Sequence, residues 1–179
     1  MNQSLKRCLA LALYAKKGQS LPMENLNEQG MTATGTPKLE TQLCFALYAA
    51  SRATIDIYRP LLDELGITYP QYLVLLILWE RGACAVKDIG NLLHLDSGTL
   101  SPLLKRLEGA GFIKRQRRAE DERVVDISLT EQGQMLKSQA IAIPEKFVCE
   151  LGISFHEYIT LMTGLKKLTD HLYARQIAG

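Results

Sequence analysis

Residues 86–108 read VKDIGNLLHLDSGTLSPLLKRLE, which contains two short helical patterns in succession. The first pattern covers 86–93 and the second covers 98–108, and in each the apolar residues recur at the spacing of a helix with one buried face. Two short amphipathic helices joined by a turn such as HLDS, residues 94–97, predict a helix-turn-helix unit. Pro102 is discordant, because a proline inside a helix removes one backbone hydrogen bond.

The sequence after this unit changes to the period of two that is typical of strands. FIKRQR, residues 112–117, and VVDISL, residues 124–129, predict a hairpin joined by the charged segment RAEDER, residues 118–123. A helix-turn-helix followed directly by a charged hairpin predicts a winged helix-turn-helix. The expected fold class is therefore mainly α with a small β-wing.

Longer apolar helical patterns precede and follow the winged unit. Residues 39–65 predict a first helix, and residues 70–81 predict a second that is apolar almost all round and has Thr68 as its N-cap. On the other side, Thr130 is expected to cap a helix that runs towards Ile143 and is broken or bent at Pro144. The last helix begins with the capping box Ser154-x-x-Glu157.

The outer helices have apolar faces that a small winged core could not fully cover. This uncovered apolar surface predicts a homodimer, whose two-fold symmetry would present two DNA-recognition units to the two halves of a palindromic site. The alternative is that the faces close one intramolecular core. The predicted organisation is a flexible extension over 1–37, in which Met23 and Met31 are alternative starts, and one winged-helix domain over 38–179, with a DNA-binding unit at about 69–129 and dimerisation helices at about 39–65 and 130–176.

Composition excludes several classes of protein. The 179 residues are 47% hydrophobic and 22% charged, as in ordinary globular proteins, and the net charge of +2 means that any DNA-binding surface must be a local cluster. No apolar run approaches the ~20 residues that cross a bilayer, so we expect a cytoplasmic protein without membrane contact. The four cysteines, at 8, 44, 84 and 149, lack metal-binding spacing, and neither a metal nor a cofactor is expected.

One basic cluster begins in the second helix of the helix-turn-helix. It consists of Lys105, Arg106, Lys114, Arg115, Arg117 and Arg118, against a single acid, Glu108. Such a surface binds phosphates, so double-stranded promoter DNA is the predicted partner and the affinity should fall steeply with salt. Arg106 lies off the leucine face and is a candidate for a base or phosphate contact. The small residues that open the helix would let DNA approach closely; they are Ser97, Gly98, Thr99 and Ser101.

The hairpin adds a second candidate contact. Asp121 and Arg123 are two residues apart in a tight turn, so the carboxylate could hold the guanidinium in one orientation. An ordered arginine at a wing tip suits the narrow, negative minor groove of DNA. The alternative is that these charges only keep an exposed hairpin soluble.

Cys44 lies near the start of the first helix, within LCFALY, residues 43–48. The positive end of the helix dipole raises the reactive thiolate fraction of a cysteine there, but a buried, inert cysteine is the alternative. Pro37-x-x-x-Thr41-x-x-Cys44 matches the short active-site pattern of peroxiredoxins. Because the surroundings are helical, with no βαβ succession, we treat the match as chance and expect no catalytic residue and no enzyme.

Three segments, LDSGTLSPLLKRLE at 95–108, EDERV at 120–124 and ISLTE at 127–131, resemble the multiple antibiotic resistance regulator (MarR) family. The resemblance covers about residues 38–176. It implies an obligate winged-helix dimer that represses its target by occupying a palindromic promoter site.

Three further segments, QLCFALYAASR at 42–52, YRPLLD at 58–63 and ITYPQY at 67–72, resemble the organic hydroperoxide resistance regulators within that family. The resemblance implies that Cys44 is the peroxide sensor, and that tyrosines of the other subunit matching Tyr58 and Tyr69 hydrogen-bond to it. Tyr48, one helical turn beyond Cys44, is a weaker supporting candidate.

Cys149 falls where the two-cysteine type of this subgroup has its resolving residue. The implied sequence is oxidation of Cys44 by an organic hydroperoxide to a sulfenic acid, a disulfide to Cys149 of the partner subunit, and release of DNA. The rival interpretation within the family is a repressor released by a small phenolic ligand, with Cys44 lining the pocket. Cys8 and Cys84 have no predicted role.

Overall fold

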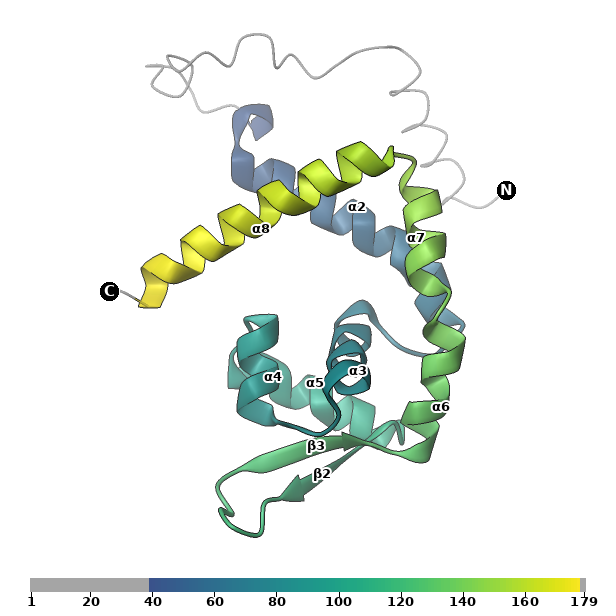
Figure 1. Cartoon of the computed structure of the whole chain (residues 1–179), viewed down its shortest axis with the longest axis vertical. Helices are drawn as coiled ribbons and strands as arrows, with labels where there is room; N and C mark the ends of the chain where they lie inside the picture. Colours follow the sequence, from purple (N-terminus) through teal and green to yellow (C-terminus); the bar gives the residue numbers. More distant parts are fainter. Residues whose placement is uncertain (1–38, 178–179) are drawn as a thin grey trace. The chain divides into compact units, whose positions relative to one another are not determined.

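The computed structural model describes residues 39–177, and the expected extension over 1–37 lies outside them. Its elements, labelled in Figure 1, are η3 (Leu39–Thr41), α2 (Leu43–Asp63), α3 (Tyr69–Arg81), β1 (Cys84–Ala85), α4 (Val86–Leu93), α5 (Ser97–Gly109), β2 (Ile113–Arg117), β3 (Val125–Leu129), α6 (Glu131–Ala140), α7 (Ile143–Leu151) and α8 (Phe155–Ile177). The prediction of a mainly α fold with a small β-wing is confirmed. Internal contacts divide the chain into residues 1–45 and 46–179, so η3 and the first turn of α2 are described apart from the rest.

The wing is a three-stranded antiparallel sheet in the order β1-β3-β2. The predicted hairpin pairs Ile113 with Leu129 and Arg117 with Val125, and β1 adds Cys84 opposite Ile127. Each hairpin strand begins one residue later than its sequence pattern. The sequence did not reveal β1, because two residues are too few to show a period.

The helix-turn-helix is formed by α4 and α5, as expected. Between them His94 adopts a left-handed conformation, with φ of 53°, and the amide of Leu95 donates to the carbonyl of Gly90 over 2.9 Å. A Cβ at Gly90 would lie 3.0 Å from the carbonyl oxygen of Leu95, a tight contact, so the turn favours a glycine there. Pro102 lies within α5, where its ring costs only the bond to the carbonyl of Gly98.

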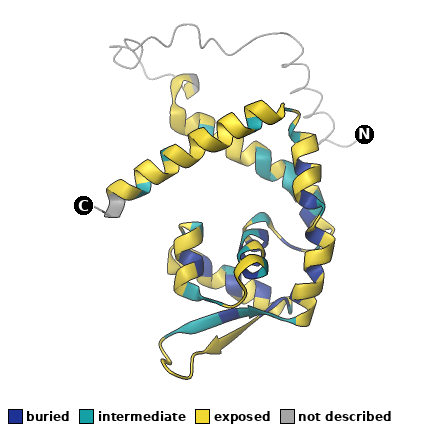
Figure 2. Ribbon diagram, in the orientation of Figure 1, coloured by how far each residue is buried: buried dark blue, intermediate teal, exposed yellow. Residues whose placement is uncertain are grey.

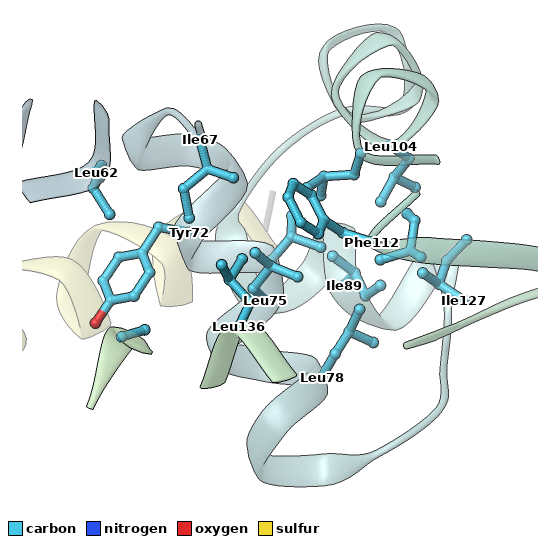
Figure 3. Close-up of a cluster of buried hydrophobic side chains, with 14 of the residues drawn as sticks. Leu62, Ile67, Tyr72, Leu75, Leu78, Ile89, Leu104, Phe112, Ile127 and Leu136 are labelled. Atoms are coloured by element: carbon cyan, nitrogen blue, oxygen red, sulfur yellow. The ribbon is translucent and has the colours of Figure 1, made fainter. Parts of the chain in front are cut away.

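The hydrophobic core of the 46–179 part joins α3, α4, α5 and the sheet (Figure 3). Leu75, Ile89 and Ile127 are fully buried in it. The leucine face predicted for α5 supplies Leu100, Leu104 and Leu107, none of them more than 1% exposed. The near-continuous apolar pattern of α3 is explained, because this helix packs against α4, α5, α6 and β3.

The base of the wing is fixed to α6 by tight backbone contacts. The hydroxyl of Thr130 donates to the carbonyl of Gly111 and accepts from the amide of Gly133 over 3.1 Å, which caps α6 as predicted. The indole N–H of Trp79 donates to the carbonyl of Gly133 over 3.0 Å. A Cβ at Gly133 would collide with the carbonyl oxygen of Phe112, so this crossing of backbones requires a glycine.

The C-terminal helices differ in one respect from the expectation. The helix that starts at Glu131 ends at Ala140, and Pro144 lies in the first turn of α7 rather than at the break. A proline is well accommodated there, because the first amides of a helix have no intrahelical acceptor. The capping box before α8 is confirmed, since the amide of Ser154 donates to Glu157 over 2.8 Å and the amide of Glu157 donates to the Ser154 hydroxyl over 3.3 Å.

Helix α8 is coloured as exposed along most of its length (Figure 2), and several of its large apolar residues are among the exposed ones. Leu161 is 55% exposed and Met162 51%, and no described residue of this helix is buried. These faces therefore do not close an intramolecular core. One ring contact ties α8 to the helix-turn-helix, because Tyr173 stacks on His94 with ring centroids 3.7 Å apart. Among residues 39–177 no helix is long and apolar enough to cross a membrane.

Candidate DNA-binding surface and redox centre

The start of α5 is capped by Asp96. Its carboxylate accepts the amide of Thr99 over 2.9 Å and the hydroxyl of Thr99 over 3.1 Å, and these bonds lower the pKa of Asp96 below its usual range. Thr99, a predicted DNA contact, therefore has its amide and hydroxyl already engaged. Ser97, Gly98 and Ser101 are exposed beside it and stay candidate contacts.

The basic cluster is exposed throughout, but only part of it lines a groove. Arg115 and Arg118 line this groove together with Ser97 and with Arg123 of the hairpin, between the wing and the helices α4 and α5. Lys105 and Arg106 on α5, and Lys114 and Arg117 on β2, are exposed but do not line this groove. Lys87 of α4 also lines it, a basic residue that the sequence pattern did not single out.

At the wing tip the expected contact between Asp121 and the guanidinium of Arg123 is not formed. The carboxylate instead accepts the backbone amide of Arg123 over 3.0 Å, and the amide of Val124 donates to the carbonyl of Asp121 over 2.9 Å. Asp121 thus shapes the turn, because an aspartate readily bonds the backbone two residues on. Within the described part of the chain the guanidinium of Arg123 has no ion pair.

A different ion pair closes the base of the wing tip. The guanidinium of Arg118 donates to both carboxylate oxygens of Asp126, over 2.7 Å and 3.0 Å. The pair raises the pKa of Arg118 and lowers that of Asp126. Sequence reasoning missed Asp126. The signal was present, because Arg118 directly follows one predicted strand of the hairpin and Asp126 lies near the start of the other, and opposite charges on paired strands attract each other.

The two cysteines predicted for redox sensing are both exposed free thiols. Cys44 is the second residue of α2, and Cys149 lies in α7. Cys84 is half-buried in β1, where burial raises the pKa of its thiol and it contacts the carbonyl of Gly82 over 3.6 Å. Cys8 lies outside the described residues. No group of side chains among residues 39–177 could hold a metal ion.

The structure brings Tyr58 and Tyr69 together in an aromatic cluster. Their ring centroids are 4.8 Å apart, Tyr72 lies 6.1 Å from Tyr58, and Phe147 of α7 stacks on Tyr58 at 4.3 Å. Burial, reinforced by Tyr69, raises the pKa of Tyr58, and burial does the same for Tyr69. Both phenols therefore stay protonated as hydrogen-bond donors, and Phe147 links them to the helix that carries Cys149.

Tyr48 is not part of that cluster. It is 57% exposed on α2, and its hydroxyl accepts a hydrogen bond from Arg52 over 3.1 Å, which raises the pKa of Arg52. Sequence reasoning did not assign Tyr72 or Phe147 to this cluster. Phe147 reaches it only because α7 meets α2, where its ring stacks on Tyr58.

Two comparisons bear on the class of protein. A family model described as transcriptional regulator SarA/Rot matches residues 56–140. Two solved structures of AbfR, a protein of Staphylococcus epidermidis, resemble this chain. The reduced protein bound to DNA is 41% identical with a TM-score of 0.66, covering 76% of this chain and 93% of its own; the disulfide form is 37% identical with a TM-score of 0.56, covering 85% and 99%. The fold and its basic groove thus define a winged helix-turn-helix transcription regulator.

The organic hydroperoxide resistance transcriptional regulator of Bacillus subtilis is 61% identical over 107 residues, which are 60% of this chain and 73% of that protein. The chain belongs to the MarR family, among its organic hydroperoxide resistance regulators. The resemblance inferred from the sequence is confirmed. So is the expectation of a regulator rather than an enzyme, because these relatives are named as transcription regulators.

Proposed function

We propose that this chain is a cytoplasmic, homodimeric repressor that binds double-stranded promoter DNA while Cys44 is reduced and releases it when an organic hydroperoxide oxidises that thiol. The observation that carries the proposal is the exposed Cys44 in the first turn of α2, in a chain 61% identical to a regulator named for organic hydroperoxide resistance. A thiol near a helix N-terminus and open to solvent is accessible to a peroxide.

The uncovered apolar side chains support the homodimer. Leu161, Met162 and Leu165 of α8 and Tyr48 of α2 are all at least 44% exposed in the single chain. Large apolar side chains left exposed in this number are costly in water and are typical of a subunit interface. In a two-fold dimer, a pairing of Cys44 with Cys149 of the partner subunit would be repeated, so two such pairs could form.

The redox chemistry proceeds in two steps. The Cys44 thiolate attacks the terminal peroxide oxygen, the O–O bond breaks, and the leaving alkoxide takes a proton from the solvent, so the products are a sulfenic acid and an alcohol. The thiolate of Cys149 of the partner subunit then attacks the sulfenic sulfur and forms a disulfide, and the leaving hydroxide takes a proton from the solvent and becomes water. The phenols of Tyr58 and Tyr69 would donate hydrogen bonds to the sensor sulfur of the other subunit.

We assign release of DNA to the disulfide rather than to oxidation of the sulfur as such. AbfR has been solved bound to DNA in both a reduced and an overoxidised state, and separately with a disulfide formed. A disulfide needs Cα atoms within about 7 Å, so it constrains the helices that carry the two cysteines. In this chain α7 carries both Cys149 and Phe147, and Phe147 stacks on Tyr58.

Contacts connect α7 and α8 to the proposed DNA-binding surface. α8 follows α7 after Gly152, and its Tyr173 stacks on His94, in the turn that precedes α5. A displacement of α7 and α8 would therefore move α5 and change the distance between the two DNA-recognition units of the dimer. A palindromic site of fixed spacing would then no longer be matched.

A promoter-binding assay with and without cumene hydroperoxide, paired with a non-reducing gel, tests the proposal. Wild-type protein should release DNA and form a crosslinked dimer, and Cys44→Ser should keep DNA binding and lose both responses. Cys149→Ser should lose the crosslink, and Cys84→Ser is the matched control that should behave as wild type. Release of DNA from Cys44→Ser would refute the sensor assignment, and release by salicylate under excess reductant would favour the phenolic-ligand alternative.

A further inference from the structure

We propose that Arg118 is a positioning residue of the wing and not one of its phosphate contacts, and that it acts by holding the wing tip to the sheet through Asp126. The inference rests on the proposed binding of DNA. On this inference, Arg118 differs from the other basic residues of the cluster: it positions the wing, and the others are free to neutralise phosphate.

The pair has the geometry of a strong interaction. Two guanidinium nitrogens of Arg118 meet the two carboxylate oxygens of Asp126 over 2.7 Å and 3.0 Å. Most exposed ion pairs contribute little to stability, but a bidentate arginine–carboxylate pair is the favourable exception, because two parallel bonds fix one orientation. The two side chains are partly shielded, with exposures of 44% and 28%.

The place of Asp126 in the sheet makes it a firm anchor. It lies in β3, the central strand, opposite Gln116 of β2 on one side and Ala85 of β1 on the other. Arg118 follows β2 directly, and its amide donates to the carbonyl of Val124 over 2.9 Å. The loop of residues 118–124 is therefore closed at its base by a backbone bond and by the ion pair, and Arg123 is carried on that loop.

The same pair removes Arg118 from the charge available to DNA. Its positive charge is balanced by Asp126, whereas Arg115 and Arg123, which line the same groove, have no ion pair within residues 39–177. A phosphate would have to displace a carboxylate that is already bound through both oxygens. An arginine without an ion pair pays no such cost, so the phosphates should be neutralised by Arg115 and Arg123.

The salt dependence of promoter binding separates the two roles. Each lost phosphate contact reduces the slope of log K against log salt by about 0.9, so a substitution present in both subunits of a dimer should reduce it by about 2. Arg115→Ala, the matched control in the same groove, should show this reduction. Arg118→Ala should weaken binding about five- to tenfold at every salt concentration and leave the slope unchanged.

Two milder variants give results of opposite sign for the two roles. Asp126→Asn should weaken binding if Asp126 positions the wing, but should strengthen it if Asp126 only withholds Arg118 from phosphate. Arg118→Lys keeps the charge and loses the bidentate geometry, so a positioning role predicts weaker binding and a phosphate role predicts binding close to wild type. The double variant Arg118→Ala/Asp126→Asn should be no weaker than either single variant, because both remove one interaction.

The outcomes distinguish this inference from the proposed function. If wild type binds the promoter and Arg118→Ala reduces the slope as much as Arg115→Ala does, Arg118 is a phosphate contact and the inference fails alone. If wild type shows no salt-dependent binding of promoter DNA, the proposed function fails and the inference fails with it. Because Arg118→Lys and Asp126→Asn alter exposed side chains conservatively, a circular dichroism spectrum like that of wild type is expected for both.

Discussion

Substitution of Gly133 by alanine should destabilise the fold far more than one added methyl group suggests. The new Cβ would collide with the carbonyl oxygen of Phe112, so the two backbones must separate. The carbonyl of Phe112 cannot move freely, because it accepts the amide of Thr130 over 3.1 Å.

The size of the effect follows from what that separation breaks. Overpacking of a tight site costs about 1–3 kcal/mol. The Thr130 cap on the amide of Gly133 contributes about 1 kcal/mol, and the bond from Trp79 to the carbonyl of Gly133 contributes about 1 kcal/mol more. The free energy of unfolding should therefore fall by about 3–5 kcal/mol.

Urea unfolding followed by circular dichroism measures this change at one fixed protein concentration, since the stability of a dimer depends on concentration. Gly109→Ala is the matched control, because a Cβ at the end of α5 meets nothing within 4 Å. It should change the stability by no more than about 1 kcal/mol. If the free energy of unfolding of Gly133→Ala is within about 1 kcal/mol of the wild-type value, the backbones of Gly133 and Phe112 do not approach each other closely.

Two further predictions concern the DNA-binding unit. Leu104→Ala leaves a cavity at a fully buried site and should lower the free energy of unfolding, measured in urea, by about 2–5 kcal/mol. Leu92→Ala, at a leucine that is 38% exposed, should lower it clearly less. Equal losses of stability would contradict the packing of α5. The bonds from Thr99 lower the pKa of Asp96 in the native state, so its contribution to stability is fully present above its ordinary pKa of 3.8 and is lost as the pH falls through the lower native value. Asp96→Asn should thus be less stable than wild type near neutral pH, and its free energy of unfolding should fall less steeply as the pH is lowered. If the two proteins lose stability in acid along curves of the same shape, Asp96 does not stabilise α5 as a charged cap.

Local spacing was sufficient to predict most of the fold from the sequence. The helix-turn-helix, the hairpin and the caps at Thr68, Thr130 and Ser154 depend on residues within a few positions of one another, and the structure has each of them. Strand β1 and the end of α6 escaped prediction. Two residues carry no period, and a proline near a helix end is compatible with stopping one helix or starting the next.

The candidate site was less predictable, because it depends on contacts between distant residues. Residue type and spacing selected the basic cluster, but only the folded hairpin decides that Arg118 meets Asp126 and that Asp121 meets a backbone amide. Tyr58 and Tyr69 were selected by resemblance alone. The contact of Tyr58 with Phe147, some ninety positions later, follows from tertiary packing that no local pattern encodes.

The protein contains a single tryptophan, Trp79, at the junction of α3 with the backbone of α6. Its indole N–H is bound to Gly133, its carbonyl accepts the ammonium of Lys137 over 3.2 Å, and Tyr72 meets its ring edge-on at 6.2 Å. Intrinsic fluorescence therefore reports from one defined joint, between the helix at the centre of the core and the helix that leads out of the wing. A shift in its emission on oxidation would reveal strain at that joint without any added dye.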